Sequence, residues 1–565
     1  MLPIRRFLPC LLAAVFLAAC QTRFVEVAQR LPSTRRTLAP RRVATPKPLP
    51  SVTPAAPRLL QPSSSPSLAV VSPSPSPSPS SPATPSLPVR NVPPAIAVLP
   101  LALNAGEGTG LDEETENLLV VSSALVSPLP QLRLVAQDVA AAYTLRAINE
   151  TGPQLRPAHR GDRHAAFRRL EQRRTGLIPQ NTYSLKQSVP LERGATRDFW
   201  VITDFVEDRY VEAEVRAEVL KVSTHCYVMV DQVALRTAVG RRKMQEMAEE
   251  IGGTFDTVVY PTNTKLFGAE PRPGVDGDPR IFILISPAVG NYGRDTTLGY
   301  FSQRDAFARD SRAGSALARS NQAEILYVSS LVVAEGTPED YMGTIAHEFQ
   351  HMINFNQKVL VHKNRTAEAL WVDEGMAMYA IEAAGYGLKS GGAVLASHVK
   401  GFQRKPWAYS LSDWDQNPEG IGYGAVYLLM VYMADRFGAD IIQSIVTSSG
   451  LGTENLDKVL SSKGSSLNEV FHDWALANVL DSSIQNRDAR YQYRSLKMRG
   501  ANGKTELSGF LNQKLEMPAE VVGAGRPFSV QYYRLPNGVI DPRVEINGTS
   551  ASNWRLFPRL VLPQE

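Results

Sequence analysis

Cysteine is scarce in this chain, with Cys10, Cys20 and Cys226 as the three among 565 residues. So few cysteines argue against a fold held by a disulfide framework. If Cys10 leaves with a leader peptide and Cys20 is modified, Cys226 has no partner inside the protein. We therefore expect Cys226 to be a small buried thiol and the fold to depend on core packing, with a metal ion as a further aid.

A large charge imbalance is also missing. The 60 Lys and Arg residues nearly balance 55 Asp and Glu, which leaves a net charge of +5. This near-neutrality argues against a dedicated nucleic-acid binder, so no nucleic acid is expected among the partners. No Gly-rich phosphate loop is evident either, and no membrane segment is expected downstream of the N-terminal apolar stretch.

The N-terminus has the organisation of an export signal. Arg5 and Arg6 precede an apolar stretch, Leu8 to Ala19, that is too short for a stable transmembrane helix but fits a signal-peptide core. Its end, Leu17-Ala18-Ala19-Cys20, resembles the lipobox of bacterial lipoproteins. We expect residues 1–19 to be a lipoprotein signal peptide and a lipid on Cys20 to anchor the protein in the bacterial cell envelope, at the outer membrane or cell surface. The alternative is ordinary secretory cleavage beside an incidental cysteine.

Residues 20–95 are rich in Pro, Ser, Ala and Thr, and residues 73–88 approach a Ser-Pro repeat. Such composition cannot build a packed core and favours extended polyproline II. The segment is predicted to be a disordered tether between the lipid and the folded part.

The remaining chain predicts an α+β protein. Strand-like runs dominate residues 96–220, which we expect to form an N-terminal β-rich domain, although the Arg- and His-rich stretch 150–180 suggests surface or loop. Residues 221–485 combine buried strands, among them 280–285 and 324–333, with a mainly helical part after Pro338. Alternation returns near residue 508, so residues 505–565 are predicted to be a small C-terminal β-domain.

The stretch from His347 to His351 has the pattern H-E-x-x-H. Residues four apart on an α-helix are offset by about 40° around the axis, so both imidazoles face one side. Two neutral imidazoles suit Zn²⁺, and Glu348 beside the first ligand can act as general base toward a zinc-activated water. The alternative is a pair of exposed helix histidines flanking a glutamate.

Catalytic zinc needs three protein ligands and an open position. A second predicted helix supplies Glu374 as the candidate third ligand to one zinc ion per chain. His362 is the rival, but it lies in the predicted loop between the helices. It also lacks the metzincin context, in which a third histidine follows a glycine soon after the second.

The run from His347 to Asn354, followed by Glu368-x-x-Trp371-x-x-Glu374-Gly375-x-Ala377, resembles the hyicolysin family of neutral metalloendopeptidases, which are gluzincins. The likeness spans roughly residues 220–440. It implies a thermolysin-like catalytic domain, in which a mixed β-sheet subdomain precedes a helical subdomain. It also implies zinc on His347, His351 and Glu374, Glu348 as the catalytic base, and a protein or peptide substrate.

Hydrolysis also needs a donor for the oxyanion. Relatives with a gluzincin fold often use a Tyr or His downstream of the third ligand, and Tyr423, between two glycines at the start of a later helix, is the candidate here. Its alternative is a packing role. Asp373 and Glu382 are candidates to orient a ligand histidine.

Three functions remain open from the sequence. The first is an endopeptidase, in which the peptide backbone binds along an exposed strand edge at residues 324–328. The second is an aminopeptidase, for which Glu324 is the one candidate amine anchor. The third is a non-enzymatic envelope or adhesion protein with a degenerate peptidase domain, against which the intact ligand set argues. A pro-segment role for residues 96–200 also stays open.

Overall fold

The protein is described from a computed structural model. It describes strands at 96–99, 115–123, 131–137 and 142–144, and residues 163–563 with gaps at 177–188, 207–208, 291–297, 313–314, 316, 413, 415–420, 482–487, 511–512, 515–521, 525–527, 536–540 and 548–553. The expected signal peptide, the tether and Cys20 lie outside the described residues.

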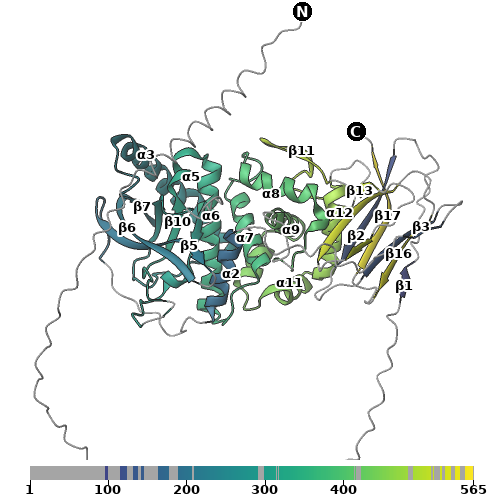
Figure 1. Ribbon diagram of the computed structural model, residues 1–565, viewed down its shortest axis with the longest axis horizontal. Coiled ribbons are helices and arrows are strands. Elements are labelled where there is room, and N and C mark those ends of the chain that lie inside the picture. Colours follow the sequence, from purple (N-terminus) through teal and green to yellow (C-terminus); the bar gives the residue numbers. More distant parts are fainter. Residues whose placement is uncertain are drawn as a thin grey trace, which may run out of the picture. The chain divides into compact units, whose positions relative to one another are not determined.

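Strands between Thr196 and Ser329 form a six-stranded mixed sheet (Figure 1). Its order is β5 (Thr196–Val206), β6 (Arg209–Val222), β7 (Cys226–Asp231), β8 (Ile281–Ser286), β10 (Ile325–Ser329) and β9 (Gly299–Phe301). β7, β8 and β10 run parallel, and the other neighbours pair antiparallel. The α+β class is therefore confirmed. The domain boundary expected at residue 220 falls inside β6. Because β6 pairs with both β5 and β7, the sheet continues across that boundary.

Both faces of this sheet are buried, as continuous apolar runs in parallel strands predict. Side chains such as Val228, Ile283 and Val328 point into one core. Their neighbours Tyr227, Phe282 and Tyr327 belong to a second core on the opposite face. Phe167, from far upstream in the sequence, packs into that second core.

Helices dominate the chain around and after the sheet. The described ones are α2 (Arg163–Thr175), α3 (Ala238–Thr254), α4 (Tyr260–Phe267), α5 (Ser330–Glu335), α6 (Pro338–Phe355), α7 (Leu370–Ala383), α8 (Ala393–Arg404), α9 (Ile421–Phe437), α10 (Asp440–Thr447), α11 (Gly452–Ser461) and α12 (Leu467–Leu480). None of these described helices is both long enough and apolar enough to cross a membrane.

Two sequence expectations differ from these elements. The strand expected over residues 324–333 ends at Ser329, where α5 begins, because only its first part pairs with β8 and β9. The stretch 150–180, expected at the surface, contains α2, and Phe167 and Leu170 of this helix are 2% and 1% exposed.

Strands from the two ends of the chain pair with one another. β2 (Thr115–Ser123) lies between β15 (Ser529–Leu535) and β17 (Trp554–Pro563), while β3 (Gln131–Gln137) pairs with β16 (Asp541–Asn547). The smaller partners in these two sheets are β1 (Ile96–Leu99), β4 (Ala142–Thr144), β13 (Gln513–Lys514) and β14 (Val522–Ala524). A separate hairpin joins β11 (Arg499–Asn502) to β12 (Thr505–Ser508). Strands of the expected N-terminal and C-terminal β-domains thus share sheets.

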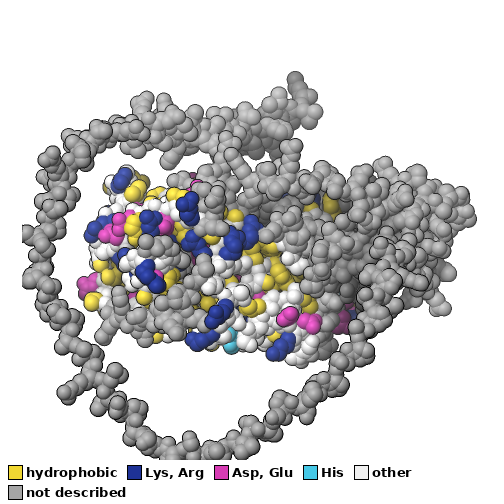
Figure 2. Space-filling model, turned by 60° about the horizontal axis from the view of Figure 1, so that its bottom comes forward, with side chains coloured by type: hydrophobic (Ala, Val, Ile, Leu, Met, Phe, Trp, Pro, Cys, Tyr) yellow, Lys and Arg dark blue, Asp and Glu magenta, His cyan; other side chains and the backbone are white. Residues whose placement is uncertain are grey.

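The described surface carries mixed charge. On the face in Figure 2, Lys and Arg side chains lie among acidic, apolar and uncharged ones rather than in one continuous stretch. This mixture is what the nearly neutral net charge predicts. Inside the protein, Cys226 on β7 is a buried free thiol, as expected.

Candidate metal centre

Helix α6 carries the H-E-x-x-H residues, and its start is fixed locally. Thr337 and Asp340 form a reciprocal capping box, and Pro338 occupies the first turn, where its missing N–H costs no helical hydrogen bond. Ile345, Phe349 and Met352 bury one side of the helix in the core. The histidines at positions 347 and 351 consequently share the other side.

His347, His351 and Glu374 converge. The two Nε2 atoms are 3.1 Å apart, and Oε2 of Glu374 lies 3.3 Å from the first and 3.6 Å from the second. Glu374 reaches them from α7, which packs beside α6. The structure therefore brings together the three residues that the sequence singled out as ligands, while His362 lies elsewhere and contacts the carbonyl oxygen of Thr447 at 2.7 Å.

The spacing of these atoms fits one zinc ion. Ligands at about 2.0–2.1 Å in a tetrahedral arrangement are separated by roughly 3.3 Å. Both carboxylate oxygens of Glu374 are buried and have no hydrogen-bond partner among the described residues. Burial opposes ionisation of Glu374, but His351 and His347 hold its pKa well below the usual range. A buried carboxylate facing two imidazoles is a donor set that zinc satisfies.

Glu348 lies beside this cluster on the wall of a cavity of about 370 Å³. The same cavity is lined by His347, Tyr423 and apolar side chains that include Met378 and Leu395. Burial raises the cost of charging Glu348, yet His164 and His347 lower its pKa to about 2. The residue is thus an anion that faces a space large enough for part of a peptide.

Tyr423 stands at the start of α9, 6% exposed, and its ring packs edge-on against Trp414 with centroids 5.3 Å apart. Its hydroxyl lies 3.1 Å from Nδ1 of His164. Tyr423 therefore packs against Trp414 and also lines the cavity beside Glu348.

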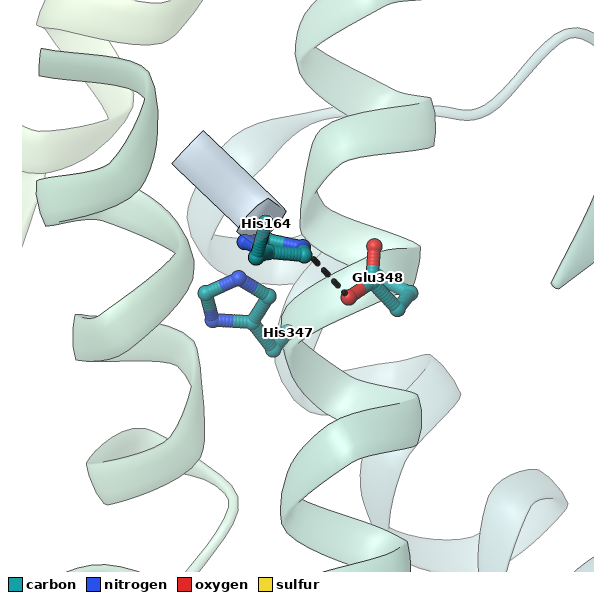
Figure 3. A group of neighbouring side chains, drawn as sticks. All are labelled: His164, His347 and Glu348. Carbon is teal, nitrogen blue, oxygen red and sulfur yellow. Dashed lines mark ion pairs between the residues drawn. The ribbon is translucent and has the colours of Figure 1, made fainter. Parts of the chain in front are cut away.

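Sequence reasoning missed two residues of the site, His164 and Arg168, both on α2. In Figure 3, the ring of His164 lies beside His347 and is directed at Glu348, with its Nε2 3.6 Å from Oε1. Arg168 donates to Asp373 at 2.8 Å. The local sequence around His164 and Arg168 gives no sign of this role, because their partners lie about 200 residues downstream.

The two orienting candidates behave differently. Asp373 contacts Nδ1 of His351 at 3.0 Å. Glu382 instead accepts hydrogen bonds from the Leu388 amide and the Tyr427 hydroxyl, so it holds a turn and α9 rather than a histidine.

Glu324 is not placed to anchor a substrate amine. It is 2% exposed and accepts a hydrogen bond of 3.0 Å from the Val275 amide, and it does not line the cavity beside Glu348. The prediction that residues 324–328 form an exposed strand edge is also wrong, because β10 lies between β8 and β9. Of the described strands, β9 is the one at this edge of the sheet.

Comparison with known proteins finds a similar metalloprotease but no matching protein-family model. The neutral metalloprotease ShpI of Staphylococcus hyicus is 32% identical over 145 residues, which cover 24% of this chain and 30% of that protein. The chain therefore matches less than a third of the relative's length. No protein-family model matches the chain. The match supports a metalloprotease, in agreement with the chemistry of the His and Glu cluster.

Proposed function

We propose that the chain is a zinc metalloendopeptidase of the gluzincin type, similar to hyicolysin, that hydrolyses peptide bonds of protein or peptide substrates. The observation that carries the proposal is the convergence of His347, His351 and Glu374 beside Glu348 on a cavity wall. The metalloprotease name of the Staphylococcus hyicus relative supports it. A thermolysin-like catalytic domain is part of the proposal, and the mixed sheet followed by helices is compatible with it.

In the proposed mechanism, each residue of the site has a separate role in hydrolysis. Zinc on His347, His351 and Glu374 would acidify a water molecule and polarise the scissile carbonyl. The carboxylate of Glu348 takes the proton of the attacking water and delivers it to the leaving amine. The hydroxyl of Tyr423 donates to the oxyanion that forms on the carbonyl oxygen. Asp373 keeps the imidazole of His351 oriented.

We propose that the peptide backbone of the substrate binds along the outer edge of β9. β9 pairs with β10 on one side, and none of the other described strands pairs with it. Leu298 and Gly299, at its start, line the cavity that Glu348 also lines. A peptide that adds to this edge would therefore place a bond near the base.

Glu348→Gln tests the function. The variant should fold and keep one equivalent of zinc, yet lose peptide cleavage by at least ~10²-fold, because the amide cannot accept the water's proton. His351→Ala should lose most of the zinc as well as activity, and Tyr423→Phe should lower kcat with zinc unchanged. Under conditions in which the wild type cleaves peptides, cleavage by Glu348→Gln at the same rate would refute the mechanism.

We also propose that lipid on Cys20 anchors the enzyme in the bacterial cell envelope. The support is the sequence Leu17-Ala18-Ala19-Cys20 behind a basic and apolar leader. Cys20→Ser should release the protein from membranes and stop incorporation of a labelled lipid precursor. Cys10→Ser is the matched control, since that cysteine lies inside the leader, and it should stay membrane-bound. Equal membrane association of both variants would contradict the anchor.

A further inference from the structure

His164 occupies the space in which the proposed reaction must take place. Its Nδ1 lies 3.1 Å from the Tyr423 hydroxyl and 3.9 Å from Oε1 of Glu374, while its Nε2 lies 3.6 Å from Oε1 of Glu348. One imidazole thus lies within 4 Å of the proposed base, a metal-site carboxylate and the proposed oxyanion donor. Figure 3 shows its approach to Glu348.

A substrate needs the same three neighbours. In the proposed mechanism the attacking water contacts Glu348, and the scissile carbonyl points its oxygen at Tyr423. The imidazole of His164 lies within 4 Å of both of these side chains, where the attacking water and the carbonyl oxygen would contact them. A nitrogen atom of His164 also lies within 4.8 Å of the facing nitrogen of His347 and an oxygen of Glu348. An imidazole at this place is a further nitrogen donor beside His347 on α6.

The helix that carries His164 is firmly held. Phe167 and Leu170 are buried, Arg168 pairs with Asp373, and Glu171 accepts a hydrogen bond of 2.8 Å from the Gln303 amide. Gln172 donates to the carbonyl of Glu368 at 2.7 Å. These contacts hold residues 167–172 of α2, the part of the helix that directly follows the turn carrying His164.

We propose that α2 is a built-in blocking segment, and that His164 keeps the site latent by acting as an additional imidazole ligand to its metal in the place of substrate. This inference rests on the proposed function, because it assumes zinc on the three ligands and Glu348 as base. It assigns to residues 163–175 an inhibitory role toward the same chain. Activation would then require that His164 be displaced from between Glu348 and Tyr423.

Metal spectroscopy on the full chain tests the inference independently of activity. The protein is loaded with Co²⁺ or Zn²⁺, and X-ray absorption counts the imidazoles on the metal. Wild type should show three, and His164→Ala and His164→Ser should both show two. His362→Ala is the matched control, a partly buried histidine bonded to Thr447, and it should keep three. Two imidazoles in wild type would overturn the proposal.

Cleavage of a peptide library gives the second readout. His164→Ala should raise kcat/KM by about tenfold or more, because apparent substrate affinity scales with the fraction of molecules in the open state. A fall in cleavage with zinc retained would show that His164 serves the reaction and would overturn the blocking role. Failure of every variant to bind metal would instead refute the proposed function, whereas full metal binding with no gain in His164→Ala refutes only the inference.

Discussion

Asp373 contacts Nδ1 of His351 at 3.0 Å, within α7 and α6 respectively. The same carboxylate oxygen accepts a hydrogen bond from Asn354, and the other oxygen accepts one from Arg168 at 2.8 Å. A carboxylate can only accept, so Nδ1 of His351 carries the proton. A neutral His351 then offers the lone pair of Nε2 to a metal ion. Although Asp373 is buried, His351 and Arg168 hold its pKa below the usual range.

Asp373→Asn should therefore weaken zinc binding by about 10–100-fold without unfolding the protein, because the amide orients His351 less strongly and removes a charge that raises its basicity. Competition with a chromophoric chelator measures the change. Glu382→Gln is the control, since Glu382 bonds Leu388 and Tyr427 instead of a histidine. A greater loss of zinc in the control than in Asp373→Asn would mean that Asp373 does not orient the ligand.

The sequence predicted the parts of the site that depend on local spacing. α6 begins at Pro338, after which a mainly helical part was expected, and α7 (Leu370–Ala383) is the second predicted helix that supplies Glu374. The three ligand candidates meet because helical periodicity and one short connection place them. These are properties of neighbouring residues, which a single sequence displays.

The contributions of α2 and of the paired chain ends could not be predicted in this way. The sequence of α2 is rich in arginine, and its burial depends on partners such as Asp373 and Gln303 that lie far along the chain. Likewise β2 pairs with β15 and β17 across about 400 residues. Local pattern shows that a strand exists, but it does not show which distant strand completes its hydrogen bonds.

Removal of metal should lower thermal stability. Glu374 is fully buried, and its oxygens have no hydrogen-bond partner among the described residues. Zinc that binds only the folded state stabilises it by about 2.7 kcal/mol when free zinc is 100 times the Kd. A chelator should thus reduce Tm by several degrees, as followed by circular dichroism. His351→Ala should show little chelator effect, and an equal shift in that variant would place the stabilising metal elsewhere.

Glu324 should make stability depend on pH. Burial raises its pKa to about 8, with the Val275 amide opposing the shift. A carboxyl whose pKa is raised by folding stays protonated in the folded state, so stability falls as pH rises from the unfolded pKa near 4.5 to about 8. Each unit of difference is worth about 1.4 kcal/mol.

Glu324→Gln removes this titration and should leave a gain in Tm that is small at pH 5 and grows up to pH 8. Thermal melts across that range provide the measurement. Glu249→Gln, at an exposed ion pair with Lys221, is the comparison and should show no such growth. A constant difference between Glu324→Gln and wild type would mean that this carboxyl is ionised in the folded protein.

The glycine after Tyr423 should be intolerant of any side chain. A Cβ at Gly424 would lie 2.2 Å from the carbonyl oxygen of His398 and 2.8 Å from the Val399 amide nitrogen. Both are backbone atoms of α8, so no side-chain rotation relieves the contact, and α8 and α9 would have to separate. Gly424→Ala is therefore expected to cost about 1–3 kcal/mol in the free energy of unfolding.

The same substitution should also disturb the site, because Tyr423 is the adjacent residue and its ring packs between Trp414 and His398. We expect Gly424→Ala to lower kcat at a temperature where it remains folded, with zinc content unchanged. Gly253→Ala is the control. A Cβ at Gly253, on α3, meets nothing within 4 Å, so this variant should be neutral or stabilising by up to ~1 kcal/mol. Equal stability of the two variants in urea would show that α8 and α9 do not need the close approach at Gly424.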